Sequence, residues 1–260
     1  MAHILPVKVD RGQGDNAIVL LHGLGNNHES WTYVDRQLKK SPYRVVIVDL
    51  LGFGDAPKPS GDYTPKDHAD AVIATLDSLK LKRIILAGHS MGCIVAIEVA
   101  KQRPELVKSL VLLGAPLYKR LPRGGWWSKL TRAESAYFTI FNYLKRNRDA
   151  TIVAAKGADT LLPVLKGMEI TDETWPAFKS SLNNTIMQIK TYQDVKHITV
   201  PTLLIYGRLD IFVIKKYLKS LARKNKRYVA YETMLGPHEI TPLQGKSIAK
   251  MLGETYDKYV

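Results

Sequence analysis

The fold is decided by residues 82–104, which read KRIILAGHSMGCIVAIEVAKQRP. Residues 83–87 form a short apolar run rich in β-branched side chains, which is typical of a strand buried on both faces of a parallel sheet. From Met91 onward, apolar residues recur with helical spacing until Pro104 ends the pattern. The stretch therefore predicts a buried strand, a tight turn and a buried helix in direct succession.

The turn between these two elements reads GHSMG at residues 88–92 and matches the pattern G-x-S-x-G. In this pattern the serine occupies a strained strand-to-helix turn, and the glycines leave room where a Cβ atom would clash. Ser90 then lies at the helix N-terminus, where free backbone N–H groups and the helix dipole stabilise a negatively charged oxygen. We interpret Ser90 as a candidate nucleophile.

Outside this stretch, strand-like apolar runs alternate with helical patterns. Such alternation is typical of a mostly parallel sheet whose strands are joined by crossover helices, so we assign the chain to the α/β class. Thr64, Pro65 and Asp67 supply an N-cap, a proline in the first turn and an early acid for one of these helices. Further strands are predicted at residues 4–9, 17–21, 43–49, 107–113, 201–207 and 227–231, and further helices at residues 28–39, 64–79 and 242–259.

The alternation is interrupted after residue 116. Residues 117–196 contain helical patterns and no strand-like run, and we interpret them as a helical cap inserted into the sheet domain. The expected organisation is a first core part at residues 1–116, the cap at 117–196 and a second core part at 197–260. The first part of the cap is rich in aromatic residues, namely Trp126, Trp127, Tyr137, Phe138, Phe141 and Tyr143.

Length and composition narrow the class of protein. The chain has 260 residues, a length that one large α/β domain commonly reaches. It contains no apolar run of about 18 residues, and residues 1–10 lack the basic and apolar segments of a signal peptide. Cys93 is the only cysteine, which excludes an internal disulfide and a zinc site built from several thiolates. We therefore expect a soluble protein that is not exported and works in the cytoplasm.

The formal net charge is +14, and the excess of Lys and Arg is concentrated in two segments. One is residues 117–156, and the other is residues 211–231, which carry seven Lys or Arg residues and no acid. In the second segment, helical spacing places the apolar residues Ile211, Ile214, Leu218 and Leu221 opposite the basic ones. Because no nucleic-acid motif accompanies these segments, we expect a solvated basic face and not a nucleic-acid or membrane binder.

The ordered set of motifs resembles the α/β-hydrolase family over essentially the whole chain. The resemblance implies an α/β-hydrolase fold with an inserted cap, and it is strongest to capped serine carboxylesterases, a group that includes a pimeloyl-carrier methyl ester esterase. The family order of serine, then acid, then histidine is also present. The motifs are HGLG at residues 22–25, DLLGFG at 49–54, GHSMG at 88–92, PTLLIYG at 201–207 followed by Asp210, and GPH at 236–238.

Carried over to this chain, the resemblance assigns a role to five residues. Ser90 is the nucleophile, His238 the general base and Asp210 the acid that orients the base. The backbone N–H groups of Leu24 and Met91 form the oxyanion hole. The resemblance implies no metal and no organic cofactor.

Two positions depart from the family pattern. Asp55 stands where a small hydroxyl residue is common, and Pro237 stands where glycine is frequent. Neither change removes a catalytic group, although Pro237 stiffens the loop that carries His238.

Other interpretations of the acid and of the histidines remain open at this point. Asp210 is also placed as a helix N-cap before Ile211, and Asp194 and Asp49 are alternative acids. Two further histidines, His22 and His89, flank the motifs and are expected to pack or to bind backbone groups. Cys93 is expected to be a small core residue.

The function favoured by these residues is hydrolysis of carboxylic esters with small to medium apolar acyl groups, through an acyl-enzyme. Serine at position 90 argues against epoxide hydrolase and haloalkane dehalogenase chemistry, which needs a carboxylate nucleophile there. Two alternatives remain: a carbon–carbon bond hydrolase of vinylogous diketones, and a non-catalytic ligand-binding protein with the same fold. The expected partner is a small-molecule ester, nucleic acid is not expected, and the oligomeric state stays open.

Overall fold

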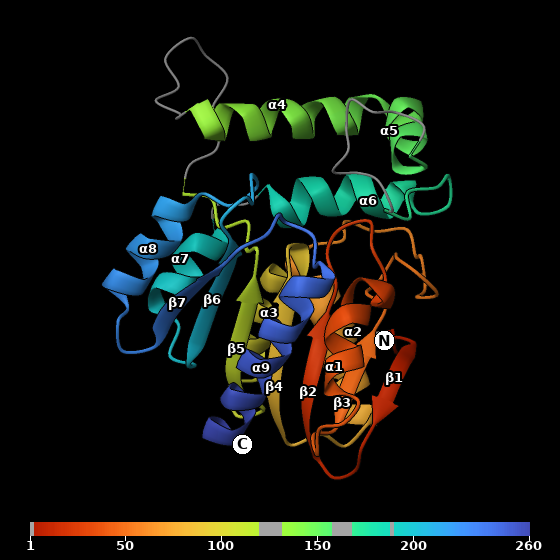
Figure 1. Ribbon diagram of the computed structural model, residues 1–260. Helices are drawn as coiled ribbons and strands as arrows, with labels where there is room; N and C mark the ends of the chain where they lie inside the picture. Colours follow the sequence, from red (N-terminus) through yellow and green to blue (C-terminus); the bar gives the residue numbers. More distant parts are fainter. Residues whose placement is uncertain (1–2, 120–131, 158–167, 188–189) are drawn as a thin grey trace.

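A single twisted sheet forms the centre of the computed structural model, which describes residues 3–119, 132–157, 168–187 and 190–260 (Figure 1). Within these residues the sheet has seven strands in the order β1-β3-β2-β4-β5-β6-β7. The pairing of β1 with β3 is antiparallel and every other pairing is parallel. The strands are β1 (Val7–Arg11), β2 (Asn16–Leu21), β3 (Val45–Val48), β4 (Arg83–His89), β5 (Val107–Leu113), β6 (Thr202–Gly207) and β7 (Val229–Met234).

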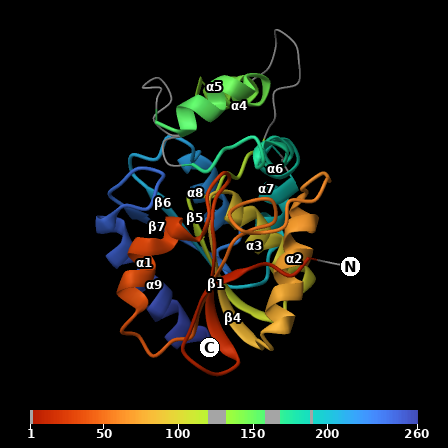
Figure 2. The same cartoon turned by 90° about the vertical axis from the view of Figure 1, so that its right-hand side faces the viewer.

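Helices cover both faces of the sheet, so alternate residues of the inner strands enter two different cores. Ile18 and Ile85 pack with α1 (Thr32–Leu38) and α9 (Pro242–Tyr259) on one face. Val19 and Leu86 pack on the other face with α2 (Pro65–Ser78), α3 (Met91–Gln102) and α8 (Lys215–Lys224). Figure 2 shows α1 and α9 on one side of the sheet and α2 and α3 on the other. The predicted α/β class with a mostly parallel sheet is therefore confirmed.

Side-chain caps define the start of the two longest core helices. Thr64 Oγ1 accepts a hydrogen bond from the N–H of Asp67, and the carboxylate of Asp67 accepts one from the N–H of Thr64. Thr241 and Gln244 form the same reciprocal pair at the start of α9. Each pair satisfies backbone donors that a helix N-terminus leaves free. The start of α2 agrees with the prediction made from Thr64, Pro65 and Asp67.

Three helices that follow β5 lie above the carboxyl ends of the strands. Figure 1 shows α4 (Arg132–Arg146), α5 (Arg148–Ala155) and α6 (Trp175–Ser181) across this edge, followed by a π-helical turn at Leu182–Ile186. The next helix, α7 (Lys190–His197), packs instead beside α3 and α8. The boundaries predicted for a separate cap stay predictions. Trp126, Trp127 and the side chain of Tyr137 lie outside the described residues.

Polar contacts attach α6 and the π-helical turn to the sheet domain. The imidazole of His68 on α2 is buried, and its Nε2 lies 3.1 Å from Ser181 Oγ. Thr185 donates to the carbonyl of Tyr63 at 2.7 Å, and Asn184 donates to that of Asp62 at 2.7 Å. Burial lowers the pKa of His68 to about 4, because the charged ring would lose its hydration. His68 is therefore neutral in the folded protein near neutral pH.

Two elements near the basic segment differ from the prediction. The strand expected at residues 227–231 begins two residues later, because a turn at Asn225 accepts the N–H groups of Tyr228 and Val229. The residue Ile211 is 62% exposed and was wrongly expected on the buried face of a helix. The carboxylate of Asp210 accepts the N–H of Phe212, so the chain turns there and α8 begins only at Lys215.

None of the described helices combines the length and the apolar character that crossing a bilayer requires.

We predict that His68 makes folding stability depend on pH. The unfolded ring binds a proton below its ordinary pKa of 6.5, and the folded ring does so only below about 4. The unfolded state then binds more protons in this window, so stability falls as pH drops through it. His68→Asn should remove about 2 kcal/mol of the stability that wild type loses between pH 7.5 and pH 5, measured as urea unfolding curves.

The exposed His197 provides the matched control. His197→Asn should leave the pH dependence of the unfolding curves as it is in wild type. Equal pH dependence in wild type and His68→Asn would contradict a neutral, buried His68.

Candidate active site

Ser90 occupies a strained turn between β4 and α3. Its backbone angles are φ 53° and ψ −117°, a region that non-glycine residues rarely enter. A Cβ atom at Gly88 would lie 2.3 Å from the carbonyl oxygen of Gly92, and one at Gly92 would lie 2.4 Å from that of Leu21. The two glycines are therefore required by the close approach of backbone around Ser90, as the G-x-S-x-G pattern predicts.

The segment after β2 passes directly beside Ser90. A Cβ atom at Gly23 would lie 3.1 Å from Ser90 Cβ, so the backbone at Gly23 and Leu24 borders the serine side chain. Met91 is the first residue of α3, where a backbone N–H has no acceptor within the helix. The backbone of Gly23 and the N-terminus of α3 thus border Ser90, and the role of Leu24 and Met91 as oxyanion donors stays a prediction.

His22 holds this segment in place through contacts with backbone groups. The ring is fully buried; its Nδ1 lies 2.8 Å from the carbonyl oxygen of Gly23, and its Nε2 accepts the N–H of Leu50 at 2.8 Å. Burial lowers the pKa of His22 to about 4, so the ring stays neutral and can donate at one nitrogen and accept at the other. The expectation that His22 binds backbone groups is met.

Asp210 and His238 form a hydrogen-bonded pair at the carboxyl ends of β6 and β7. His238 Nδ1 lies 2.8 Å from Asp210 Oδ2, and Asp210 Oδ1 accepts the N–H of Phe212 at 2.8 Å. The carboxyl group of Asp210 is buried, which by itself raises its pKa, but the hydrogen bond and charge of His238 and the N–H of Phe212 bring the pKa below its ordinary value. Asp210 is therefore an ionised carboxylate facing one nitrogen of the imidazole.

His238 and Ser90 line the same cavity. Gly114 leaves room for the imidazole, because a Cβ atom there would lie 3.0 Å from His238 Cε1, and its φ of +61° also favours glycine. The neighbour of the serine, His89, has its Nε2 2.9 Å from the carbonyl oxygen of His238. Burial lowers the pKa of His89 to about 3, so its neutral ring donates this bond and fixes the backbone that carries His238.

The cavity is narrow and mostly apolar. Its volume is about 50 Å³, and about 10–15 Å³ of such volume holds one water molecule. It therefore accommodates roughly four groups of the size of a water molecule or a methylene. Besides Ser90 and His238, the apolar side chains that line it are Leu24, Pro116, Tyr118, Ile140, Phe141, Leu144, Met168, Phe178, Leu182, Ile186 and Phe212.

The alternative acids lie elsewhere and have other partners. Asp49 is buried and accepts from His28 and from the N–H of Asp55, which closes the turn after β3. The carboxylate of Asp194 pairs with Lys101 at 3.0 Å on the outer side of α3. The structure thus brings neither Asp49 nor Asp194 to His238.

The remaining residues singled out from the sequence have structural contacts. Asp55 forms an ion pair with Lys8. The carbonyl of Pro237 accepts from Gln244 at 3.2 Å, which ties the histidine loop to α9. Cys93 is buried, and its Sγ donates to the carbonyl oxygens at the end of β4 and β5; burial raises its pKa well above the ordinary value. Cys93 is therefore an unreactive core residue, as expected.

Sequence reasoning missed Gly114 and the contact made by His89. Gly114 follows β5 directly, and a glycine at the carboxyl end of the strand next to the nucleophile strand is a signal that side chains meet there. The contact of His89 with the carbonyl of His238 joins residues 149 positions apart, and no local pattern in the chain indicates it.

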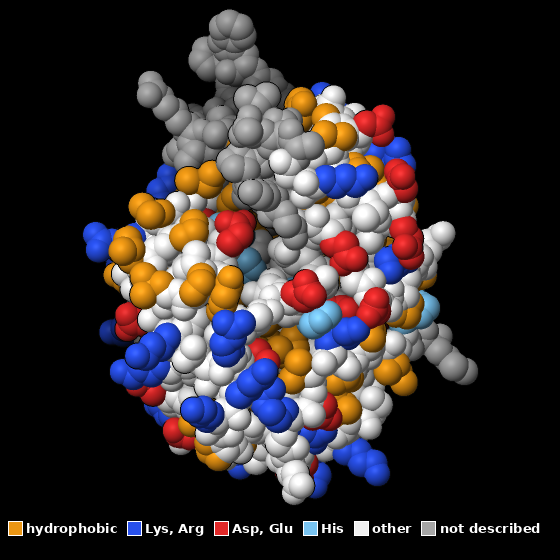
Figure 3. Space-filling model, turned by 45° about the vertical axis from the view of Figure 1, so that its right-hand side comes forward, with side chains coloured by type: hydrophobic (Ala, Val, Ile, Leu, Met, Phe, Trp, Pro, Cys, Tyr) orange, Lys and Arg blue, Asp and Glu red, His pale blue; other side chains and the backbone are white. Residues whose placement is uncertain are grey.

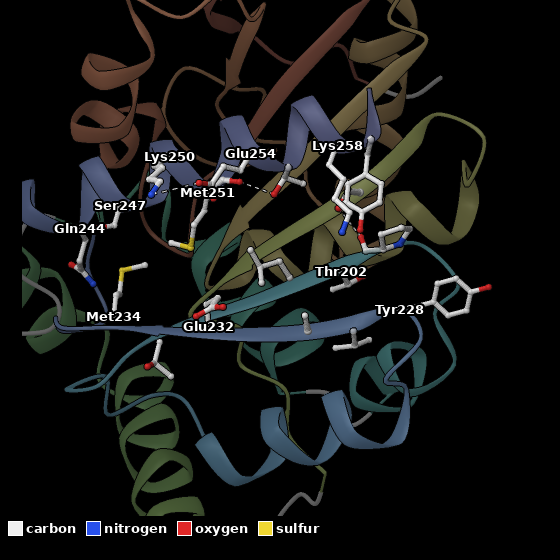
Figure 4. Close-up of a pocket in the computed structure, with 18 of the residues that line it drawn as sticks. Thr202, Tyr228, Glu232, Met234, Gln244, Ser247, Lys250, Met251, Glu254 and Lys258 are labelled. Carbon is white, nitrogen blue, oxygen red and sulfur yellow. Dashed lines mark hydrogen bonds and ion pairs between the residues drawn. The ribbon is translucent and has the colours of Figure 1, made fainter.

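A larger groove of about 880 Å³ lies between β7 and α9. Figure 4 shows Glu232 on β7 facing this space, with Lys250, Glu254 and Lys258 along α9. Neither Ser90 nor His238 lines it, so the groove is separate from the candidate active site. Within the described residues, no group of three or more His, Cys, Asp or Glu side chains could hold a metal ion.

Comparisons with known proteins agree with this architecture. An esterase from Exiguobacterium antarcticum superposes with a TM-score of 0.75, at 20% identity over 99% of this chain and 100% of its own. Probable lysophospholipase BODYGUARD 2 of Arabidopsis thaliana is 36% identical to this chain over a segment that covers 44% of this chain and 26% of the relative's own length. A second relative, (E)-2-((N-methylformamido)methylene)succinate hydrolase of Acinetobacter baylyi, is 34% identical over 43% of this chain and 41% of its own length.

The chain thus matches about a quarter of the length of the plant relative and less than half of the bacterial one. The sequence model of the alpha/beta hydrolase fold family matches a longer part of this chain, from residue 16 to residue 235. That match includes the Ser90 turn and Asp210 and ends three residues before His238. Because the family match extends over more than half of its residues, the chain belongs to the alpha/beta hydrolase fold family.

Proposed function

We propose that this protein is a serine hydrolase that cleaves carboxylic esters with small apolar acyl groups. The observation that carries the proposal is the hydrogen bond between the buried carboxylate of Asp210 and His238, beside the strained Ser90 in one cavity. A serine hydroxyl is a weak nucleophile, and a histidine held by a carboxylate is the common means of activating it.

In the proposed reaction, His238 removes the proton of the Ser90 hydroxyl as its Oγ attacks the ester carbonyl carbon. Asp210 keeps Nδ1 protonated and stabilises the imidazolium, because it bonds that nitrogen and is itself ionised. The N–H groups of Leu24 and Met91 bind the oxyanion. His238 then protonates the departing alkoxide, which leaves as an alcohol, and water attacks the acyl-enzyme by the same steps to release the acid and restore Ser90.

The cavity supports a neutral substrate with an apolar acyl group. Most of its side chains are aliphatic or aromatic, and its described residues include no Lys or Arg that would pair with a free carboxylate. We assign α4 and α6 to a cap over the site, since Ile140, Phe141 and Leu144 of α4 and Phe178 of α6 line the cavity. We include α5 in the cap because it packs against α4. The names of the relatives, a probable lysophospholipase and an esterase, agree with ester hydrolysis.

We predict that Ser90 reacts covalently with a fluorophosphonate probe, because Ser90 lines one cavity with His238, its proposed base. Intact-mass analysis should show one adduct on wild type and none on Ser90→Ala. A probe adduct that persists on Ser90→Ala would remove Ser90 from the mechanism.

We predict that Asp210→Asn lowers kcat by about 10² to 10⁴, because an amide favours the wrong tautomer of His238. Asp194→Asn is the matched control, since Asp194 makes an ion pair away from the cavity, and it should retain wild-type kcat. Circular dichroism checks that both variants are folded. A larger loss of kcat in Asp194→Asn than in Asp210→Asn would assign the acid to α7.

The size of the cavity predicts a short optimum in a series of p-nitrophenyl esters. Each methylene that enters the cavity contributes about 0.8 kcal/mol, so kcat/KM should rise by up to about fourfold per carbon from acetate. The rise should end near four carbons, where the cavity is full, and octanoate should be a poorer substrate than butyrate. A kcat/KM that still increases at octanoate would show that the cavity opens to longer chains. Testing a vinylogous diketone beside the series distinguishes carbon–carbon bond hydrolysis.

A further inference from the structure

Four large aliphatic side chains are exposed on segments that follow β6 and β7. They lie on the loops that carry Asp210 and His238 and at the start of α9. Single exposed leucines are ordinary on protein surfaces, but several on adjoining segments mark an interaction site. The four, which we call the apolar rim, are Leu209 (63% exposed), Ile211 (62%), Leu235 (60%) and Leu243 (69%).

Hydrogen bonds join the three segments of the apolar rim into one surface. The N–H of Leu209 donates to the carbonyl of Gly236 at 3.0 Å, and Gln244 on α9 donates to that of Pro237 at 3.2 Å. Figure 4 shows Met234 and Gln244 at the same end of the groove between β7 and α9, and Leu235 and Leu243 also line that groove. Hydrophobic side chains gather on this face in Figure 3, with Lys and Arg side chains beside them.

Positive charge adjoins the apolar rim on the side of α8. Lys215 donates to the carbonyl of Arg208 at 2.6 Å, and Lys219 lies 6.0 Å from the ring centroid of Tyr231 on β7. Glu232 and Glu239 are exposed acids on the neighbouring segments, and basic residues outnumber them. Residues 208–227 carry one acid, the buried Asp210, and the basic residues Arg208, Lys215, Lys216, Lys219, Arg223, Lys224, Lys226 and Arg227.

We propose that the apolar rim and the basic surface of α8 dock this protein on an anionic phospholipid bilayer. Aliphatic side chains enter the boundary between headgroups and acyl chains, while lysines pair with anionic headgroups, so the two features act on one partner. The basic surface alone agrees with a solvated face, as the sequence suggested. A solvated basic face does not explain why four aliphatic side chains are exposed beside it. A nucleic-acid backbone does not explain them either, because it offers no apolar layer in which they could be buried.

Docking in this orientation brings the loops that carry Asp210 and His238 to the lipid surface, because the apolar rim lies on and beside these loops. The Ser90 cavity would then take its ester from the bilayer. This catalytic consequence rests on the proposed function, whereas docking itself requires no reaction at Ser90.

The test is co-sedimentation of Ser90→Ala protein with vesicles, which measures binding without hydrolysis. Vesicles of phosphatidylcholine with about a quarter phosphatidylglycerol should bind the protein, and pure phosphatidylcholine vesicles should bind it at least about tenfold more weakly. Raising the salt concentration from about 0.05 M to 0.5 M should release the protein, since it screens the lysines.

Two sets of variants in the Ser90→Ala background separate the contributions. The triple change Leu209→Gln, Leu235→Gln and Leu243→Gln should lower affinity for anionic vesicles about tenfold or more. The double change Lys215→Glu and Lys219→Glu should lower it by a similar factor. The matched controls alter residues of equal kind away from the apolar rim and should bind as the parent does: Ile4→Gln, where the side chain is 61% exposed, and Lys39→Glu with Lys40→Glu.

Several outcomes would overturn the proposal. One is a lack of binding to anionic vesicles by the parent protein, and another is binding that the controls reduce as much as the rim variants do. A dimer in analytical ultracentrifugation that the triple leucine change dissociates, without vesicle binding, would assign the apolar rim to a second copy of the chain. Vesicle binding by a protein that hydrolyses no ester would contradict the proposed function and leave docking supported.

Discussion

Backbone segments approach Ser90 closely only because no Cβ atoms stand between them. Gly23, Gly88 and Gly92 border the serine turn, and a side chain at Gly88 or Gly92 would overlap backbone by more than 1 Å against ordinary contact distances. The same approach places Ser90 at the start of α3 and the backbone of Gly23 beside it. The packing of β4 against α3 and the position of Ser90 therefore both require glycine at residues 88 and 92.

Burial of a charge adds a second requirement. Asp210 is 3% exposed, and an ionised carboxylate in such a place is tolerated only when its oxygens are bonded. His238 and the N–H of Phe212 occupy one oxygen each, and the latter bond also turns the chain away from a helix after β6. The carboxylate that orients the imidazole thus also shapes the loop after β6. The fold of this loop and the proposed catalysis depend on the two oxygens of one side chain.

The parts predicted from the sequence are those that local pattern determines. The serine turn follows from two glycines and a strand, and the start of α2 follows from Thr64 and Asp67, all within a few residues. The exposure of Ile211 was not predicted, because it depends on where the side chain of Asp210 bonds. The contact of His89 with His238 and the width of the cavity depend on segments far apart in the chain, so helical and strand periodicity carry no information about them.

The π-helical turn at Leu182–Ile186 has a consequence for the shape of the cavity. The N–H of Met187 reaches back five residues to the carbonyl of Leu182, one residue more than in an α-helix. Leu182 and Ile186 both line the cavity across this widened turn. Loss of a single residue here would let the segment become α-helical and would change the angular spacing of Leu182 and Ile186 about the helix axis. The lining of the cavity is therefore set by chain length as well as by side-chain identity, and an insertion or deletion can reshape it while every lining residue keeps its type.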